Sequence, residues 1–208
     1  MPFIWVTWLT KLMSGENQCW WASWFRSHYS FNKLPSGFDL AKWTMEHNEL
    51  LHRRKGELES EGFTVFIEEQ NSFKLVGKSG ITLSGKPDII AINDGEGTVE
   101  DCKTGNPKHS DQVQVLIYLL ALPLANGRYK GLKLEGRLIY KNSSVDVHSS
   151  EIDGIREKFS KVVGTVGGTE PASKVPSLGE CRFCDISKVD CPERIETKIE
   201  NVVMTNLF

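Results

Sequence analysis

The sequence has no strong net charge, no long apolar run, no internal repeat and no low-complexity tract. Its 25 basic and 27 acidic side chains give a formal charge of −2, so a polyanion would have to bind at a local basic patch. No stretch approaches the ~20 apolar residues of a membrane span, and we expect no membrane partner. Residues 1–15 are apolar but lack the basic start and small-residue cleavage site of a signal peptide, which favours a cytoplasmic protein.

Changes of hydrophobic period along the chain predict an α/β fold with a central mixed sheet flanked by helices. Helices are expected over residues 17–31, 39–60, 111–125 and 151–163, and strands over residues 61–70, 73–79, 81–93, 97–103, 132–141 and 144–150. Pro123 is expected to end the third helix. The densest basic run, residues 53–55, is interpreted as a solvated helix face, and the Gly/Pro/Ser-rich residues 164–180 as a linker.

The stretch GKPDIIAINDGEGTVEDCKTG, residues 85–105, predicts a hairpin that carries charged side chains where a core is expected. Residues i and i+2 of a strand share a face, so Asp101 and Lys103 point one way and Cys102 the other. The glycines of the turn NDGEG, Gly95 and Gly97, are expected to supply positive φ angles. A loop with an even number of residues would place Asp88 on the face of Asp101 and Lys103.

Two carboxylates this close repel each other, and burying them is costly unless a positive charge intervenes. A Mg²⁺ or Mn²⁺ ion, which prefers oxygen ligands, would supply that charge. Lys103 beside such an ion could orient an attacking water, a combination that suits phosphodiester hydrolysis. The alternative is a surface hairpin that carries only an Asp–Lys ion pair.

The next predicted helix carries Gln114 and Tyr118 on one face, four residues apart. Gln114 lies within the otherwise apolar run VQVLIYLLAL, where a polar side chain needs a hydrogen-bond partner. The alternative is a locally bonded glutamine beside a core tyrosine.

Together the motifs GKPD, EDCK and QVLIY resemble those of the PD-(D/E)XK nucleases, in the RecB-like exonuclease branch. The resemblance implies a restriction-endonuclease-like core in which Asp88 and Asp101 bind the metal and Lys103 is catalytic. It further implies that the backbone carbonyl of Cys102 is a metal ligand, and that Gln114 and Tyr118 position the DNA or the site.

The same resemblance implies a histidine in an upstream helix that joins the metal shell. His47, followed by apolar residues at three and four positions, fits better than His52, although neither has the glycine that often precedes it by four residues. Glu100 points to the opposite face from Asp101 and is expected to lie outside the metal shell.

Three cysteines cluster as Cys181-x2-Cys184-x6-Cys191, and a closed metal site needs a fourth thiolate. Cys19 is the remaining candidate because Cys102 faces the core. Ligand type alone allows zinc or a [4Fe–4S] cluster. One distant cysteine before a C-terminal trio resembles the iron–sulfur nucleases of this branch, namely the CRISPR-associated Cas-four type and the AddB nuclease domain, and the resemblance favours [4Fe–4S].

These features predict three segments: an N-terminal helical segment (1–37), a nuclease core (38–163), and a linker with the C-terminal cysteines (164–208). The resemblance implies Mg²⁺- or Mn²⁺-dependent DNA exonuclease action on single strands or overhangs. If the protein belongs to a CRISPR system, it would trim new spacer precursors beside an integrase, in spacer acquisition. The sequence has no G-x-x-x-x-G-K-[ST] helicase motif, so a stand-alone nuclease is expected. The alternatives are a solo nuclease of DNA repair or of a mobile element, and a catalytically idle DNA-binding module with a structural metal cluster.

Overall fold

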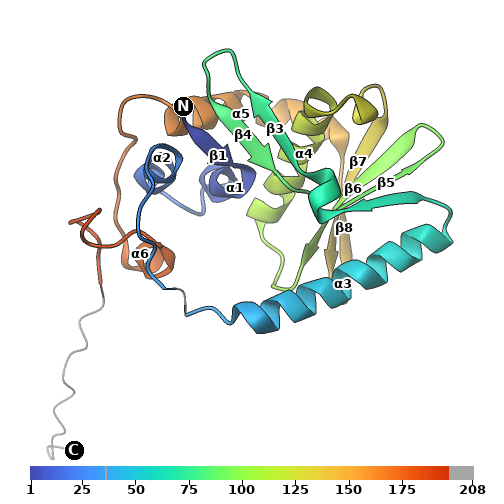
Figure 1. Ribbon diagram of the computed structural model, residues 1–208, viewed down its shortest axis with the longest axis horizontal. Coiled ribbons are helices and arrows are strands. Elements are labelled where there is room, and N and C mark those ends of the chain that lie inside the picture. Colours follow the sequence, from blue (N-terminus) through green and yellow to red (C-terminus); the bar gives the residue numbers. More distant parts are fainter. Residues whose placement is uncertain (36, 197–208) are drawn as a thin grey trace, which may run out of the picture.

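Two mixed sheets organise the computed structural model, which describes residues 1–35 and 37–196 (Figure 1). The larger sheet has the order β2-β5-β6-β7-β8, in which only β6 and β7 run parallel. Its strands are β2 (Thr64–Ile67), β5 (Ile89–Asn93), β6 (Glu96–Lys103), β7 (Lys133–Tyr140) and β8 (Ser144–Val147). The smaller sheet has the order β1-β4-β3, with strands β1 (Phe3–Trp5), β3 (Phe73–Val76) and β4 (Thr82–Gly85). The predicted α/β class with mixed sheets between helices is confirmed.

Helices cover both faces of the larger sheet. These helices and the terminal ones are α1 (Val6–Ser14), α2 (Trp20–His28), α3 (Leu40–Ser60), α4 (His109–Ala125), α5 (Ile152–Val166) and α6 (Leu178–Phe183). Alternation along β6 decides which side chain meets which helix. Val99 packs on the α4 face, and Cys102 packs against Leu50 and Leu51 of α3. No helix within the described ranges has the length and apolar character needed to cross a bilayer.

The strand predicted over 81–93 is wrong, because the chain changes sheets within it. β4 ends at Gly85, and β5 begins at Ile89 in the larger sheet. Pro87 lies between them and has no N–H to give to a sheet. The strand predicted over 61–70 ends at Ile67 and continues as a 3₁₀ turn, Glu68–Asn71.

Pro123 does not end α4, contrary to expectation. It lies in the last turn, where the missing N–H removes one hydrogen bond and the helix continues to Ala125. α5 likewise extends to Val166, beyond the predicted end at residue 163. Residues 197–208 of the segment predicted to hold the C-terminal cysteines lie outside the described residues.

The hairpin of β5 and β6 turns through Asp94 and Gly95, with φ angles of 46° and 85°. The prediction for Gly97 is wrong, because it lies inside β6, where an added Cβ would lie 2.8 Å from Leu134 Cδ2. The register pairs Ile89 with Glu100. Asp88, one residue earlier, therefore lies at the level of Asp101.

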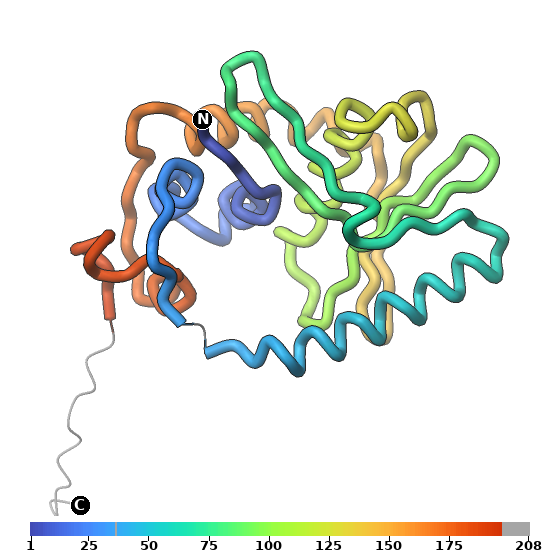
Figure 2. The backbone as a smooth tube through the Cα atoms, viewed as in Figure 1, coloured from blue at the N-terminus to red at the C-terminus, as the bar shows by residue number. Residues whose placement is uncertain are grey.

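The segment that contains α2 lies beside the residues around α6, although the two are far apart in the sequence, as the tube in Figure 2 shows. The side chain of Glu180 accepts hydrogen bonds from the backbone N–H groups of Gln18, at 3.0 Å, and Cys19, at 3.2 Å. Arg26 of α2 forms a 2.7 Å ion pair with Asp185. These contacts fasten the N-terminal segment to the residues around α6.

Candidate functional site

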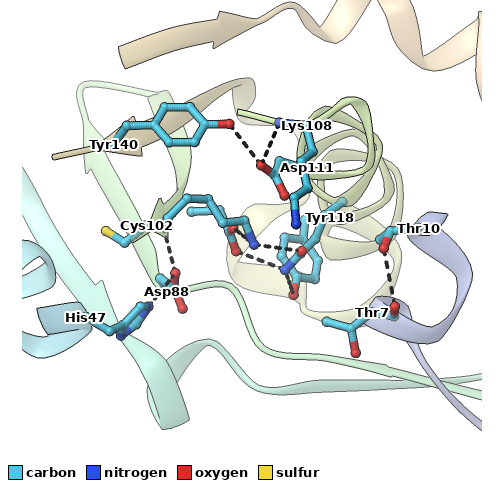
Figure 3. Close-up of polar contacts among 12 residues, drawn as sticks. Thr7, Thr10, His47, Asp88, Cys102, Lys108, Asp111, Tyr118 and Tyr140 are labelled. Atoms are coloured by element: carbon cyan, nitrogen blue, oxygen red, sulfur yellow. Dashed lines mark hydrogen bonds and ion pairs between the residues drawn. The ribbon is translucent and has the colours of Figure 1, made fainter. Parts of the chain in front are cut away.

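A cavity of about 500 Å³ opens where β6 ends, between α3, α4 and the smaller sheet. The residues predicted for catalysis and metal binding all line it: His47, Asp88, Asp101, Cys102, Lys103, Gln114 and Tyr118. Figure 3 draws polar contacts at this cavity and labels His47, Asp88, Cys102 and Tyr118 among these residues. The structure therefore brings together side chains that are up to 71 positions apart in the sequence (47 to 118).

Asp101 and Lys103 form a buried ion pair at the end of β6. Lys103 Nζ lies 2.5 Å from Asp101 Oδ2, and the two side chains are 24% and 2% exposed. Burial raises the pKa of Asp101, and the charge of Lys103 offsets this only in part. Burial also opposes the charge on Lys103, but attraction to Asp101 outweighs it and raises the pKa of Lys103. The ammonium group is thus kept protonated at the cavity.

Gln114 connects this pair to Tyr118. Its Oε1 accepts a 3.0 Å hydrogen bond from Lys103 Nζ, and its Nε2 donates to Asp101 Oδ1 and to Tyr118 Oη, both at 3.0 Å. Tyr118 Oη in turn donates to the backbone carbonyl of Lys86, at 3.3 Å. Burial raises the pKa of Tyr118, which keeps this hydroxyl a donor. The polar partner predicted for Gln114 is therefore present, and the network fixes the direction of each bond.

Gly85, the first residue of the GKPD motif, allows Tyr118 to approach the backbone. A Cβ at this position would lie 2.5 Å from Phe73 Cζ and 2.9 Å from Tyr118 Cε1. A side chain here would push the tyrosine away from the carbonyl of Lys86. The glycine is thus required by close packing next to the cavity.

Asp88 is held by groups from the neighbouring strand and from α3. Its Oδ2 accepts a 2.7 Å hydrogen bond from the backbone N–H of Cys102 and lies 3.2 Å from His47 Nε2. The hydrogen bond with Asp88 raises the pKa of His47, although burial opposes this. His47 is 7% exposed, whereas His52 is exposed to solvent on the same helix. Of the two candidate histidines, the structure brings His47 to the carboxylates.

Glu100 lies on the opposite face of β6, as the alternation predicts, and is fully buried. Arg54 of α3 binds it with two hydrogen bonds, of 2.7 Å from Nε and 2.8 Å from Nη2. The interpretation of residues 53–55 as a solvated face is therefore wrong for Arg54, whose side chain is 11% exposed. This ion pair fastens α3, and with it His47, to β6.

Several cavity residues were not predicted from the sequence. Asp111 lines the cavity, and its Oδ2 accepts a 3.0 Å hydrogen bond from Tyr140 Oη. Trp43 also lines the cavity and precedes His47 by four residues on α3. Residues at this spacing share a helix face, so the position of Trp43 at the cavity could have been predicted from that of His47. Trp5 had no such signal, because the short strand β1 was not predicted.

The cavity contains oxygen and nitrogen atoms of the kinds that bind Mg²⁺ or Mn²⁺. Asp101 Oδ2 is buried, contacts Lys103 as an ion pair and has no hydrogen-bond donor among the described residues. Two carboxylates and one imidazole are ligands that Mg²⁺ or Mn²⁺ accepts. Within residues 1–35 and 37–196, however, no three His, Cys, Asp or Glu side chains stand in a metal-binding arrangement. Lys103, His47 and the N–H of Cys102 hold the carboxylates in this structure.

The four predicted cluster cysteines line a second cavity, of about 680 Å³, between α2 and the residues around α6. Cys19, Cys181, Cys184 and Cys191 line it as free thiols, and Cys102 does not. Trp21 and Trp24 of α2 pack in the same apolar cluster as Cys191. The described thiols share this cavity without forming a metal-binding arrangement.

Comparison with known proteins gives a family match over residues 12–192, to the PD-(D/E)XK nuclease superfamily. The chain is 28% identical over 120 residues to the Gene 69 protein of Mycobacterium phage D29, covering 54% of this chain and 44% of that protein. It is 30% identical over 135 residues to a CRISPR-associated exonuclease Cas4/endonuclease Cas1 fusion of Leptospira interrogans serogroup Icterohaemorrhagiae serovar Lai (strain 56601), covering 58% and 24%. The matches thus span less than half of either curated relative. A crystal structure of SSO0001 aligns over 94% of this chain and 88% of its own, with a TM-score of 0.49 and 19% identity.

Proposed function

We propose, from the premise that the chain belongs to the PD-(D/E)XK nuclease superfamily, that it is a divalent-metal-dependent DNA exonuclease acting on single strands or overhangs. The observation that carries the proposal is the meeting of Asp88, Asp101 and Lys103 at one cavity. A core ion pair would need neither the second carboxylate nor a cavity.

In this proposal Asp88 and Asp101 hold a Mg²⁺ or Mn²⁺ ion, with His47 and the backbone carbonyl of Cys102 as further ligands. Such an ion, when bound, lowers the pKa of a ligated water and withdraws charge from a phosphate oxygen. The pairing of Asp101 with Lys103, and of Asp88 with His47, would have to loosen for both carboxylates to turn to the ion.

Lys103 is proposed to act as the catalytic cation of the chain itself. Its Nζ carries three N–H bonds, donates a hydrogen bond to Gln114 and contacts Asp101 as an ion pair. Among the described residues this leaves an N–H to hold a water or a phosphate oxygen in the cavity. Gln114 and Tyr118 then act as positioning residues, because they fix the side chains of Lys103 and Asp101 without needing to touch DNA.

A [4Fe–4S] cluster held by Cys19, Cys181, Cys184 and Cys191 is the second part of the proposal. Four free thiols around one cavity supply the number and type of ligands that such a cluster takes. Bound there, the cluster would join residue 19 to residues 181–191 and so stabilise the N-terminal segment (1–37) against the C-terminal one (164–208). Zinc at the same thiols is the alternative.

Two biological settings are compatible with this chemistry. The Leptospira relative joins an exonuclease to a Cas1 endonuclease, which supports a CRISPR role with an integrase partner. The mycobacteriophage relative supports the alternative of a nuclease carried by a mobile element.

The test is digestion of single-stranded DNA by the purified protein. We expect linear, end-labelled oligonucleotides to be degraded with Mg²⁺ or Mn²⁺ and to survive in EDTA, and closed circular single strands to resist because they have no end. Degradation of the circles would show an endonuclease. Binding of linear DNA without cleavage under any divalent metal would favour the idle DNA-binding module instead.

A further inference from the structure

Two tryptophans line the cavity of the candidate site without belonging to any of the hydrophobic clusters of the described residues. Trp5 is 39% exposed and Trp43 is 37% exposed. One comes from the end of β1, and the other from the first half of α3. Large aromatic rings left open at a polar cavity need an explanation other than core packing.

Both rings are held by their surroundings. Trp43 stacks on His47, with ring centroids 4.9 Å apart and ring planes at 25°. The ring of Phe38 lies next to Trp43 in a tilted arrangement, with 6.2 Å between the ring centroids. Trp5 lies edge-to-face with Phe3 at 5.6 Å, and its backbone pairs with Ser84 of β4. Rings that are already ordered lose little conformational entropy when a ligand stacks on them.

The cavity also has cationic side chains and the size for part of a nucleic acid strand. Lys86, Lys103 and Lys108 can contact phosphates, and the acidic side chains beside them include the two proposed metal ligands, Asp88 and Asp101. Its volume of about 500 Å³ is that of a pocket for one small molecule, which suits a nucleotide unit and is too small for a duplex. A strand entering here would bring a phosphate to Lys103 and its bases to the walls.

We propose that Trp5 and Trp43 are the base-stacking residues of this site, and that they make it specific for unpaired nucleotides. The inference rests on the proposed nuclease function and adds to it the residues that select the substrate. In a duplex both faces of each base are covered by neighbouring pairs, so only an unpaired strand can offer a base face to these rings. Stacking accepts any base, which predicts weak sequence preference.

The experiment measures binding in EDTA, so that no cleavage occurs, with three probes of equal length. These are a single-stranded oligonucleotide, an abasic single strand that keeps the phosphates, and a duplex. The variants are Trp43→Ala, Trp43→Phe, Trp5→Ala and Trp5→Phe. Met45→Ala is the matched control, because Met45 is 65% exposed on the same helix and does not line the cavity.

We expect each Trp→Ala change to weaken binding of the single strand by roughly 5- to 140-fold, the range for losing one stacked base. Each Trp→Phe variant should retain most of the affinity, and Met45→Ala should match the wild type. The abasic strand should bind the wild type weakly, and its affinity for the alanine variants should be the same as its affinity for the wild type. This comparison isolates the bases, so a loss caused by general damage to the site would affect both strands alike.

The inference is overturned if the wild type binds the abasic strand as tightly as the normal one, or if both alanine variants bind the single strand like the wild type. Either result would leave nuclease activity intact in the digestion assay. A protein that stacks bases as described but digests no DNA would contradict the proposed enzyme and leave the stacking surface standing.

Discussion

Replacing Arg54 with methionine should destabilise the fold far more than an ordinary surface charge would. Arg54 is the bidentate partner of Glu100, through bonds of 2.7 and 2.8 Å, and Glu100 is fully buried. The hydrogen bonds that Arg54 donates to Glu100 raise the pKa of Arg54, so its guanidinium group stays charged. Removing one partner leaves an uncompensated buried charge, which costs about 3–5 kcal/mol. For a chain of this size that corresponds to a fall in Tm of roughly 6–20 °C.

The assay is urea unfolding followed by far-UV circular dichroism for Arg54→Met, Glu100→Leu and the double variant. The double variant removes the buried charge altogether, so it should recover most of the loss and unfold near the wild type. Arg156→Met is the control, because Arg156 pairs with Asp153 at the surface with its side chain 58% exposed. This control should change the free energy of unfolding by about 1 kcal/mol or less.

The reasoning is refuted if Arg54→Met changes the free energy of unfolding no more than Arg156→Met does. It is also refuted if the double variant is less stable than Arg54→Met alone, since the loss would then come from packing and not from the unpaired carboxylate.

Two further predictions concern the two candidate metal sites. His47→Ala should lower DNA cleavage by roughly 10- to 100-fold and His52→Ala should leave it unchanged, because only His47 contacts Asp88; equal rates in a cleavage time course would contradict this. Protein purified without oxygen should hold about four irons per chain, as a [4Fe–4S] cluster requires. Cys19→Ser should lower iron content and soluble yield while Cys102→Ser, which alters a thiol buried between β6 and α3, leaves iron unchanged. Colourless protein with one zinc would overturn the cluster and leave the nuclease proposal in place.

Helices and strands were predicted correctly where the spacing of apolar residues within the element itself determines its type. The helix expected over 39–60 is α3, and the expected hairpin is the one formed by β5 and β6. Because the side-chain period of a strand is two, the faces of Asp101, Cys102 and Lys103 followed directly from their order. The proximity of Gln114 to these residues could also be predicted, because Gln114 lies on α4, the helix that directly follows β6.

The errors lie where distant residues decide the structure. Pro87 marks a break within residues 81–93, but nothing local shows that β4 pairs with β1 while β5 joins the other sheet. Arg54 looks like part of a surface run until Glu100, 46 residues later, is placed beneath it. Trp5 reaches the cavity only because β1 pairs with β4, a contact between residues almost 80 positions apart.

The most direct test of the central claim is single-turnover cleavage of an end-labelled single strand by Asp101→Ala and Lys103→Ala, beside Asp153→Ala. Asp153 is an exposed carboxylate of α5, with its side chain 87% exposed, and its loss should not change the rate. Losing a group that only orients a metal ligand costs about 10–100-fold, so losing the proposed carboxylate ligand Asp101 should slow cleavage by roughly 100-fold or more. Circular dichroism confirms that each variant is folded. A folded Asp101→Ala protein that cleaves at the wild-type rate would contradict the assignment of this cavity as the nuclease site.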